Sequence, residues 1–202
     1  MTAAPTVFVV DDNPAVRKSL QELMNAAGLA VETYASSAEF LASYDALRPG
    51  CLVLDVRLRG SSGLDLQDEL RRRNASVPII VITGYGDVPT SVRAFKGGAI
   101  DFLRKPVPPK ALVERIREAL AIDARARDAA EQLAGVADCI AHLTPRERQV
   151  MDLLAVGKSS KAIAKALDIS VRTVESHRRT VLRKMNVSSA AELARAVARL
   201  QP

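Results

Sequence analysis

The chain has 202 residues, which suits one or two domains, and its 48% hydrophobic and 26% charged content is ordinary for a soluble globular protein. Cys51 and Cys139 are far apart and match neither a metal site nor a CxxC motif, so a reducing compartment fits best. No run approaches the roughly 18 apolar residues of a membrane span, and no basic segment precedes an apolar signal. We therefore expect a cytoplasmic protein that does not contact a membrane.

The charge is distributed unevenly along the chain. Residues 1–122 carry a net charge of +1, residues 123–142 a charge of −2, and residues 143–202 a charge of +7. A basic excess confined to one end is expected of a nucleic-acid-binding module. Basicity alone is weak evidence, however, because many basic faces are only solvated.

The first 120 residues alternate between two patterns. Short β-branched runs lie at 6–10, 30–34, 51–54, 78–82 and 100–103. Amphipathic stretches lie between and after them, at 14–27, 36–47, 64–72, 88–96 and 109–120. This alternation predicts an α/β fold, a doubly wound (βα)5 parallel sheet. Three of the runs are apolar throughout, as in strands that helices cover on both faces.

A change of character follows at 121–141, which is rich in Ala and in charged residues. The segment predicts either a continuation of the preceding helix or a helical linker, broken near Gly135. Four charged residues there have helical spacing and are interpreted as a solvated face: Arg125, Arg127, Asp128 and Glu131. We expect domains at 1–122 and 143–202, joined by a linker at 123–142.

The last 60 residues contain no strand pattern. Thr144-Pro145-Arg146-Glu147 has the form of a capping box and predicts a helix that runs to about Ala155 and ends at Gly157. Further helices are predicted at 160–167, about 171–185 and 189–200, with a turn at 168–170. A helix, a short turn and a longer basic helix are typical of an all-α helix-turn-helix domain.

Polar residues follow the ends of the predicted strands in the first domain. Asp11 and Asp12 follow the first run, Asp55 the third, Thr83 the fourth and Lys105 the fifth. In an open parallel sheet, ligands bind outside the carboxyl ends of the strands. Clustered carboxylates need a cation, and oxygen ligands at an exposed rim suit Mg²⁺. The alternative is that the aspartates cap a helix, Thr83 lies in a turn and Lys105 is a surface lysine, which requires several coincidences at one sheet edge.

This arrangement suits phosphoryl transfer to a carboxylate. Asp55, on the middle strand, is the expected nucleophile. The metal and Lys105 would neutralise charge on the phosphoryl oxygens, and Thr83 would donate a hydrogen bond to one of them. The motifs Val9-Val10-Asp11-Asp12, Asp55, Val81-Ile82-Thr83-Gly84 and Asp101-Phe102-Leu103-Arg104-Lys105-Pro106 resemble the receiver domain of two-component response regulators across residues 5–122. Gly84-Tyr85-Gly86-Asp87-Val88-Pro89 further resembles the FixJ subgroup.

The resemblance implies specific ligands at the sheet edge. Asp55 would accept phosphate from a sensor histidine kinase. Asp12, Asp55 and the backbone carbonyl of Arg57 would hold Mg²⁺, and Asp11 would act mainly through a metal-bound water. Thr83 and Lys105 would bind phosphoryl oxygens.

The resemblance also implies a switch. Phe102 matches an aromatic residue that turns inward when Thr83 moves, although Phe102 also fits a simple core role. Arg57 and Tyr85 would line the approach to the phosphate. Arg59 stands where the family usually has Pro, which predicts a more mobile or a more basic loop.

A second resemblance covers residues 143–200. Leu143-Thr144-Pro145-Arg146-Glu147, Gly157-Lys158-Ser159-Ser160-Lys161 and Ile169-Ser170-Val171-Arg172-Thr173-Val174-Glu175-Ser176-His177 resemble the LuxR/NarL-type helix-turn-helix. Ser160 stands where Asn is usual. The family positions imply that Glu175, Ser176 and Arg179 face base edges in the major groove. Expected phosphate contacts are Lys158, Lys161, Thr173, Arg178 and Lys184.

Taken singly, each arginine is more often a solvated charge than a DNA contact, and His177 fits a structural hydrogen-bonding role better than base reading. Together the two resemblances imply a phosphorylation-switched transcription factor of the FixJ/NarL type. Its partners would be a sensor histidine kinase, double-stranded promoter DNA with an inverted repeat, a second copy of the chain and RNA polymerase. The expected dimerisation surface contains Val88, Val92, Phe95 and Lys96.

Two other classes of protein are alternatives to a phosphorylation-switched transcription factor. One is a constitutive interaction platform, which would need no acid cluster beside Lys105. The other is an enzyme such as a phosphatase with an aspartyl nucleophile. That enzyme would need an acid two residues after the nucleophile, and position 57 is Arg. We therefore expect that this protein is not an enzyme.

Overall fold

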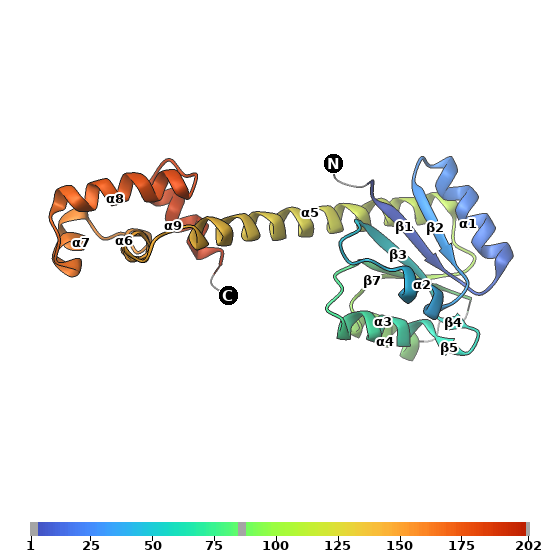
Figure 1. Cartoon of the computed structure of the whole chain (residues 1–202). Helices are drawn as coiled ribbons and strands as arrows, with labels where there is room; N and C mark the ends of the chain where they lie inside the picture. Colours follow the sequence, from blue (N-terminus) through green and yellow to red (C-terminus); the bar gives the residue numbers. More distant parts are fainter. Residues whose placement is uncertain (1–3, 85–87, 201–202) are drawn as a thin grey trace. The chain divides into compact units, whose positions relative to one another are not determined.

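A computed structural model describes residues 4–84 and 88–200 and divides into two compact units, Met1–Arg127 and Asp128–Pro202 (Figure 1). The N-terminal unit is built on a five-stranded parallel sheet in the order β2-β1-β3-β6-β7. Its strands are β1 (Thr6–Val10), β2 (Ala30–Tyr34), β3 (Gly50–Asp55), β6 (Ile79–Thr83) and β7 (Ala99–Arg104). The predicted doubly wound α/β fold is confirmed, because the chain reverses its direction of progress beside β1.

Helices cover both faces of this sheet. Their bounds are α1 (Pro14–Ala26), α2 (Ser37–Ser43), α3 (Gly63–Arg72), α4 (Val88–Lys96) and α5 (Pro109–Ala141). One core joins alternate strand residues such as Phe8 and Leu52 to α2, α3 and α4, and α3 and α4 lie together below the sheet in Figure 1. The other joins Val7 and Val53 to α1 and α5. Burial on both faces explains why the three central strands, β1, β3 and β6, are predominantly apolar.

A two-stranded hairpin that the sequence did not predict follows β3. Its strands are β4 (Arg57–Leu58) and β5 (Ser61–Ser62), and Arg59 and Gly60 form the turn between them. Gly60 has φ +78, a conformation that a residue without Cβ adopts easily. The hairpin places Arg59 at its tip, beside the carboxyl edge of the sheet.

Helix α5 runs without interruption from Pro109 to Ala141, so the predicted break near Gly135 is wrong and the predicted continuation of the helix is right. The interpretation of Arg127 as part of a solvated face is also wrong. Its guanidinium lies 2.8 Å from Asp123 and donates to the carbonyls of residues 46, 47 and 48 at 2.7–3.0 Å. Arg125, Asp128 and Glu131 are exposed, as expected.

The C-terminal unit is helical. Besides the end of α5 it contains α6 (Pro145–Ala155), α7 (Ser160–Leu167), α8 (Val171–Lys184) and α9 (Ala190–Ala198), packed around a core that includes Val150, Ile163 and Val174. The predicted capping box is present: Thr144 and Glu147 each accept a hydrogen bond from the other's backbone N–H. None of the helices in the described part of the chain has the length and apolar character needed to span a bilayer.

Candidate functional site

The carboxyl edge of the sheet opens into a pocket of about 400 Å³. Strand ends position its polar groups: Asp11 follows β1, Asp55 and Thr83 end β3 and β6, and Lys105 follows β7. The parallel registers bring these ends level, so residues up to 94 positions apart in sequence meet at one edge. The pocket is lined by Asp11, Asp12, Asn13, Val16, Asp55, Arg57, Leu58, Arg59, Thr83, Gly84 and Lys105.

Lys105 joins two of the carboxylates. Its Nζ lies 2.6 Å from an oxygen of Asp11 and 2.6 Å from an oxygen of Asp55. Burial raises the pKa of Asp11 above its usual value, against the lowering effect of Lys105. Burial lowers the pKa of Lys105, but its hydrogen bonds to the two carboxylates outweigh this and hold the pKa above its usual value. The ammonium therefore stays charged between two acceptors.

The hairpin adds a second cation to the pocket. Arg59 Nε lies 3.4 Å from a carboxylate oxygen of Asp12. The backbone N–H of Arg57 donates to Asp55 Oδ1 at 3.1 Å, which orients the side chain of Asp55. Of the two expectations for the Arg59 loop, the more basic loop agrees with this ion pair.

The donor set of this pocket is compatible with Mg²⁺. Within the described ranges, no three Asp, Glu, His or Cys side chains converge into a complete metal cage. Mg²⁺ does not require one, because it retains several waters and commonly uses one or two carboxylates. The carboxylates of Asp11, Asp12 and Asp55 all line the pocket and supply only oxygen ligands. Lys105 and Arg59 supply the positive charge that these carboxylates need in the structure.

Two residues of the expected switch differ in burial. Thr83 is fully buried beneath the pocket, and the backbone N–H of Lys105 donates to its carbonyl at 2.8 Å. Phe102, paired with Val81 across β6 and β7, is half-buried against the first core. Phe102 thus makes the core contact expected of its alternative role as a core residue. Tyr85 lies outside the described residues.

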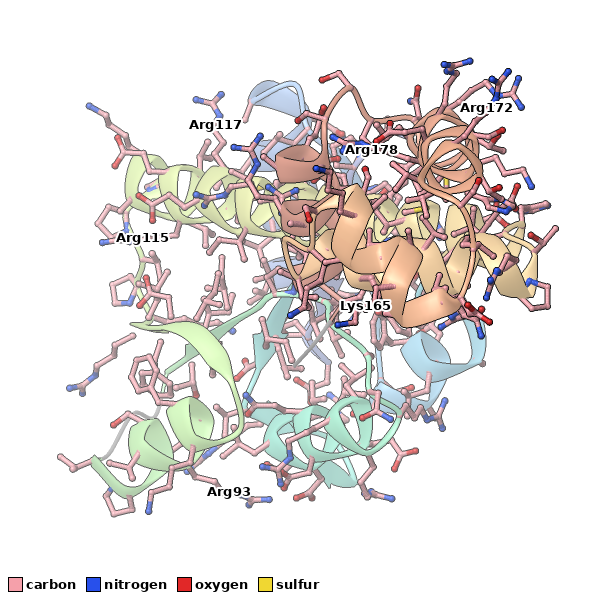
Figure 2. The ribbon with its side chains drawn as sticks, turned by 90° about the vertical axis from the view of Figure 1, so that its left-hand side faces the viewer. Arg93, Arg115, Arg117, Lys165, Arg172 and Arg178 are labelled. Carbon is pink, nitrogen blue, oxygen red and sulfur yellow. The ribbon has the colours of Figure 1, made fainter. Side chains whose placement is uncertain are left out.

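The expected dimerisation surface lies on α4. Val88, Val92 and Phe95 are 75%, 44% and 51% exposed, and Lys96 is exposed beside them. The opposite side of the helix is anchored, because Ala94 is buried in the core. Arg93, labelled in Figure 2, also ties α4 to Asp65 and Asp68 of α3 at 2.8 and 3.0 Å. The apolar side chains of α4 therefore form an exposed stripe on a fixed helix.

Helix α8 carries the basic face of the C-terminal unit. Val174 and Val181 bury one side of the helix in the core. Arg172 and Arg178, labelled in Figure 2, and Arg179 come from the remaining surface. Ser176 and Arg179 are exposed three positions apart on α8. The expected phosphate contacts Lys158, Lys161 and Thr173 are also exposed. Arg178 and His177 are half-buried.

Two of the expected DNA-contacting residues already have partners within the protein. Lys184 Nζ lies 2.7 Å from Glu147 Oε2 and donates to the carbonyl of His142 at 3.3 Å, so a phosphate would compete with this ion pair for the ammonium. Glu175 accepts a hydrogen bond from the hydroxyl of Ser160 on α7.

Comparisons with known proteins agree with both halves of this structure. The Response regulator receiver domain family matches residues 7–117, and the luxR family of bacterial regulatory proteins matches residues 141–197. Transcriptional regulatory protein FixJ of Azorhizobium caulinodans is 45% identical over 94% of this chain and 90% of its own. Nodulation protein W of Bradyrhizobium diazoefficiens is 44% identical over 94% of this chain and 83% of its own length.

The chain is a response regulator of the NarL/FixJ type. A solved structure of the response regulator StyR covers 98% of this chain and 100% of its own, with 42% identity and a TM-score of 0.89. The protein is therefore a phosphorylation-switched, DNA-binding transcriptional regulator and not an enzyme. Receiver domains work with a sensor kinase and use Mg²⁺ for phosphorylation, and luxR-family domains bind DNA.

Sequence reasoning missed three features of this response regulator. They are the β4–β5 hairpin, the attachment of Arg127 to the loop before β3, and the Ser160–Glu175 hydrogen bond. The unusual residues Arg59 and Ser160 were visible signals for the first and third. No local pattern marked Arg127, because its partners lie about 80 positions earlier.

Proposed function

We propose that Asp55 is the phosphoryl acceptor of this response regulator. The observation that carries the proposal is the position of Lys105, whose ammonium lies 2.6 Å from both Asp55 and Asp11 at one pocket. An oxygen of Asp55 forms the new bond to phosphorus as the bond to the kinase histidine breaks. Lys105 then transfers its hydrogen bond to a phosphoryl oxygen, and the Thr83 hydroxyl binds another.

The same pocket is the proposed Mg²⁺ site. Asp12, Asp55 and the backbone carbonyl of Arg57 would hold the ion, with Asp11 acting mainly through a water. Bound Mg²⁺ supplies charge neutralisation for the phosphoryl oxygens. The three carboxylates that line the pocket, those of Asp11, Asp12 and Asp55, offer the oxygen ligands that Mg²⁺ prefers and support this assignment.

The proposed output of phosphorylation is a dimer. When Thr83 moves toward the phosphoryl group, Phe102 turns inward and changes the neighbouring surface of α4. Val88, Val92, Phe95 and Lys96 then contact a second copy of the chain. Their exposure on a helix whose other side is buried supports this role.

The proposed DNA contacts lie on α7 and α8. Glu175, Ser176 and Arg179 face the base edges, and Lys158, Lys161, Thr173 and Arg178 contact phosphates. Lys184, which pairs with Glu147 in the free protein, is a further proposed phosphate contact. Two copies would bind an inverted repeat in promoter DNA and contact RNA polymerase there, in the cytoplasm.

We also propose domain boundaries for this chain. The receiver was expected to end at residue 122 and the linker to occupy residues 123–142. The contacts of Asp123 and Arg127 support a receiver that extends to Arg127. The DNA-binding domain would occupy residues 143–202, seated on the end of α5.

The decisive experiment compares wild type with Asp55→Asn, each with Mg²⁺ and with or without a small acyl phosphate. Mass in solution and affinity for promoter DNA are measured together. The acyl phosphate should increase the mass in solution and the DNA affinity of the wild type. It should change neither quantity in Asp55→Asn. Wild type that dimerises and binds DNA without labelling would instead favour the constitutive platform.

A further inference from the structure

The hydroxyl of Ser160 and the carboxylate of Glu175 connect the two helices of the helix-turn-helix. Ser160 is the first residue of α7, after the N-cap Ser159, and Glu175 is the fifth residue of α8. The Ser160 hydroxyl donates to Glu175 Oε1. The carboxylate is exposed, and Ser160 is half-buried. One oxygen of Glu175 is therefore held from outside its own helix.

This hydrogen bond is notable because cations closer in sequence are available. Arg172, Arg178 and Arg179 stand three or four positions from Glu175 on α8, the spacing at which helical side chains meet. Glu followed by Arg four residues later is the favourable order for an ion pair. None of the ion pairs in the described part of the chain includes Glu175. The carboxylate is directed toward α7 instead.

The hydrogen bond from Ser160 determines which oxygen of Glu175 remains available to the DNA. Oε1 of Glu175 accepts from Ser160, so Oε2 can accept from a base edge. The exocyclic amino group of cytosine is the major-groove donor that Glu commonly contacts. The arginines keep their charge free for phosphate and guanine. A carboxylate paired to Arg179 would instead be drawn along α8, and its charge would offset that of the arginine at the DNA.

We propose that Ser160 is a positioning residue that orients Glu175 toward a cytosine in each half-site of the operator. The inference rests on the proposed DNA contacts of α8 and deepens them. Loss of the Ser160 hydroxyl would therefore change base preference at one position of each half-site.

The experiment uses the full-length protein, phosphorylated with a small acyl phosphate and Mg²⁺. Wild type first selects its operator from a random double-stranded library. Affinity is then measured for the selected operator and for single-base variants of it. Glu175→Ala identifies the base pair at which preference disappears. Wild type should prefer cytosine there by about tenfold.

Ser160→Ala should reduce that preference to about twofold and leave the other positions unchanged. Ser160→Thr, which keeps the hydroxyl, should retain the full preference for cytosine. Adding Ser160→Ala to Glu175→Ala should have no further effect, because the two residues act as a pair. Lys161→Ala, the matched control on α7, should weaken binding to every operator equally.

Two results would overturn the inference while leaving the proposed function intact. One is full cytosine preference in Ser160→Ala. The other is a uniform loss of affinity in that variant without change in preference. If wild type selected no sequence at all, the proposed DNA readout would fail, and the role of Ser160 would fail with it.

Discussion

Arg127 lies 2.8 Å from Asp123 one turn earlier on α5, and this pair attaches the helix to the loop before β3. Asp123 is 2% exposed and also accepts a hydrogen bond from the backbone N–H of Gly50 at 2.9 Å. Gly50 must be glycine, because a Cβ there would lie 2.1 Å from the carbonyl oxygen of Thr6. Helix, loop and central strand are thus joined at the amino ends of the strands, away from the pocket at their carboxyl ends.

Arg127→Ala should destabilise the receiver by about 2 kcal/mol, because it leaves Asp123 buried without its cation and removes hydrogen bonds from three carbonyls. Tyrosine fluorescence in urea is a suitable measurement. The chain has three tyrosines and no tryptophan, and all three tyrosines lie before residue 86, so the signal reports the receiver alone.

Arg125→Ala provides the matched control for Arg127. Arg125 lies on the same helix but is exposed and donates only to the carbonyl of Ala121. We expect a change below about 0.5 kcal/mol for this exposed position. Equal effects of the two substitutions would show that Arg127 does not fasten the helix.

The sequence predicted the pocket well because its residues follow the ends of strands. Apolar runs identify those strands, and parallel pairing brings Asp11, Asp55, Thr83 and Lys105 to one edge. Arg127 could not be recognised in this way. In an Ala-rich helix, a charged residue that bonds a distant loop has the same local pattern as a solvated one.

Gly135 and the hairpin illustrate two other limits of sequence reasoning. Glycine within a helix costs only about 1 kcal/mol relative to alanine, which the alanine-rich neighbours of Gly135 offset. The strands β4 and β5 have two residues each, too few for an alternating pattern to appear. The ion pair of Lys184 was not predicted, because its partner Glu147 lies 37 positions earlier in the sequence.

Arg59→Ala should increase the affinity of the receiver for Mg²⁺. The guanidinium lies 3.4 Å from Asp12, so its removal takes a competing positive charge from a proposed ligand. Because Arg59 is highly exposed, water screens the charge, and we expect a change of about three- to fivefold. Calorimetric titration of the unphosphorylated protein measures it directly, without any dependence on phosphorylation.

Arg59→Lys serves as the control, since it keeps the charge and should leave Mg²⁺ affinity within about twofold of wild type. Raising the salt concentration should reduce the difference between wild type and Arg59→Ala. Equal affinities of wild type and Arg59→Ala at low salt would argue against competition between Arg59 and the metal.

Gly63→Ala should disturb the pocket around Asp55 through the backbone. A Cβ at Gly63 would lie 2.0 Å from the carbonyl oxygen of Asp55, so β3 or the start of α3 must move. We expect a loss of about 2–3 kcal/mol in stability, the range for overpacking a tight interior, together with slower labelling by a small acyl phosphate. Tyrosine fluorescence and mass spectrometry measure the two effects.

Gly60→Ala separates this crowding from a general effect of replacing glycine. Gly60 has φ +78, but nothing lies within 4 Å of its added Cβ. Only backbone strain of about 1–2 kcal/mol should result. A Gly63→Ala protein that labelled like wild type would show that the close approach to Asp55 does not govern the pocket.

Glu147 and Lys184 predict how the stability of the C-terminal unit depends on pH. The hydrogen bond from Lys184, followed by that from the backbone of Thr144, lowers the pKa of Glu147 to about 2 from its usual 4.5. Folding therefore favours the ionised carboxylate. The resulting stabilisation is present above about pH 4.5 and is lost as pH falls through about 2.

Glu147→Gln should consequently destabilise this unit by about 2 kcal/mol at pH 7, because a charge-assisted hydrogen bond is lost. The difference from wild type should shrink as the pH falls from 4.5 toward 2. Amide hydrogen exchange of α6 and α8 in the full chain measures it, since all the tyrosines lie in the receiver. Arg183→Gln, which changes the exposed neighbour of Lys184, should have little effect at any pH. If the difference between Glu147→Gln and wild type stayed constant down to pH 2, the Lys184–Glu147 pair would not be its source.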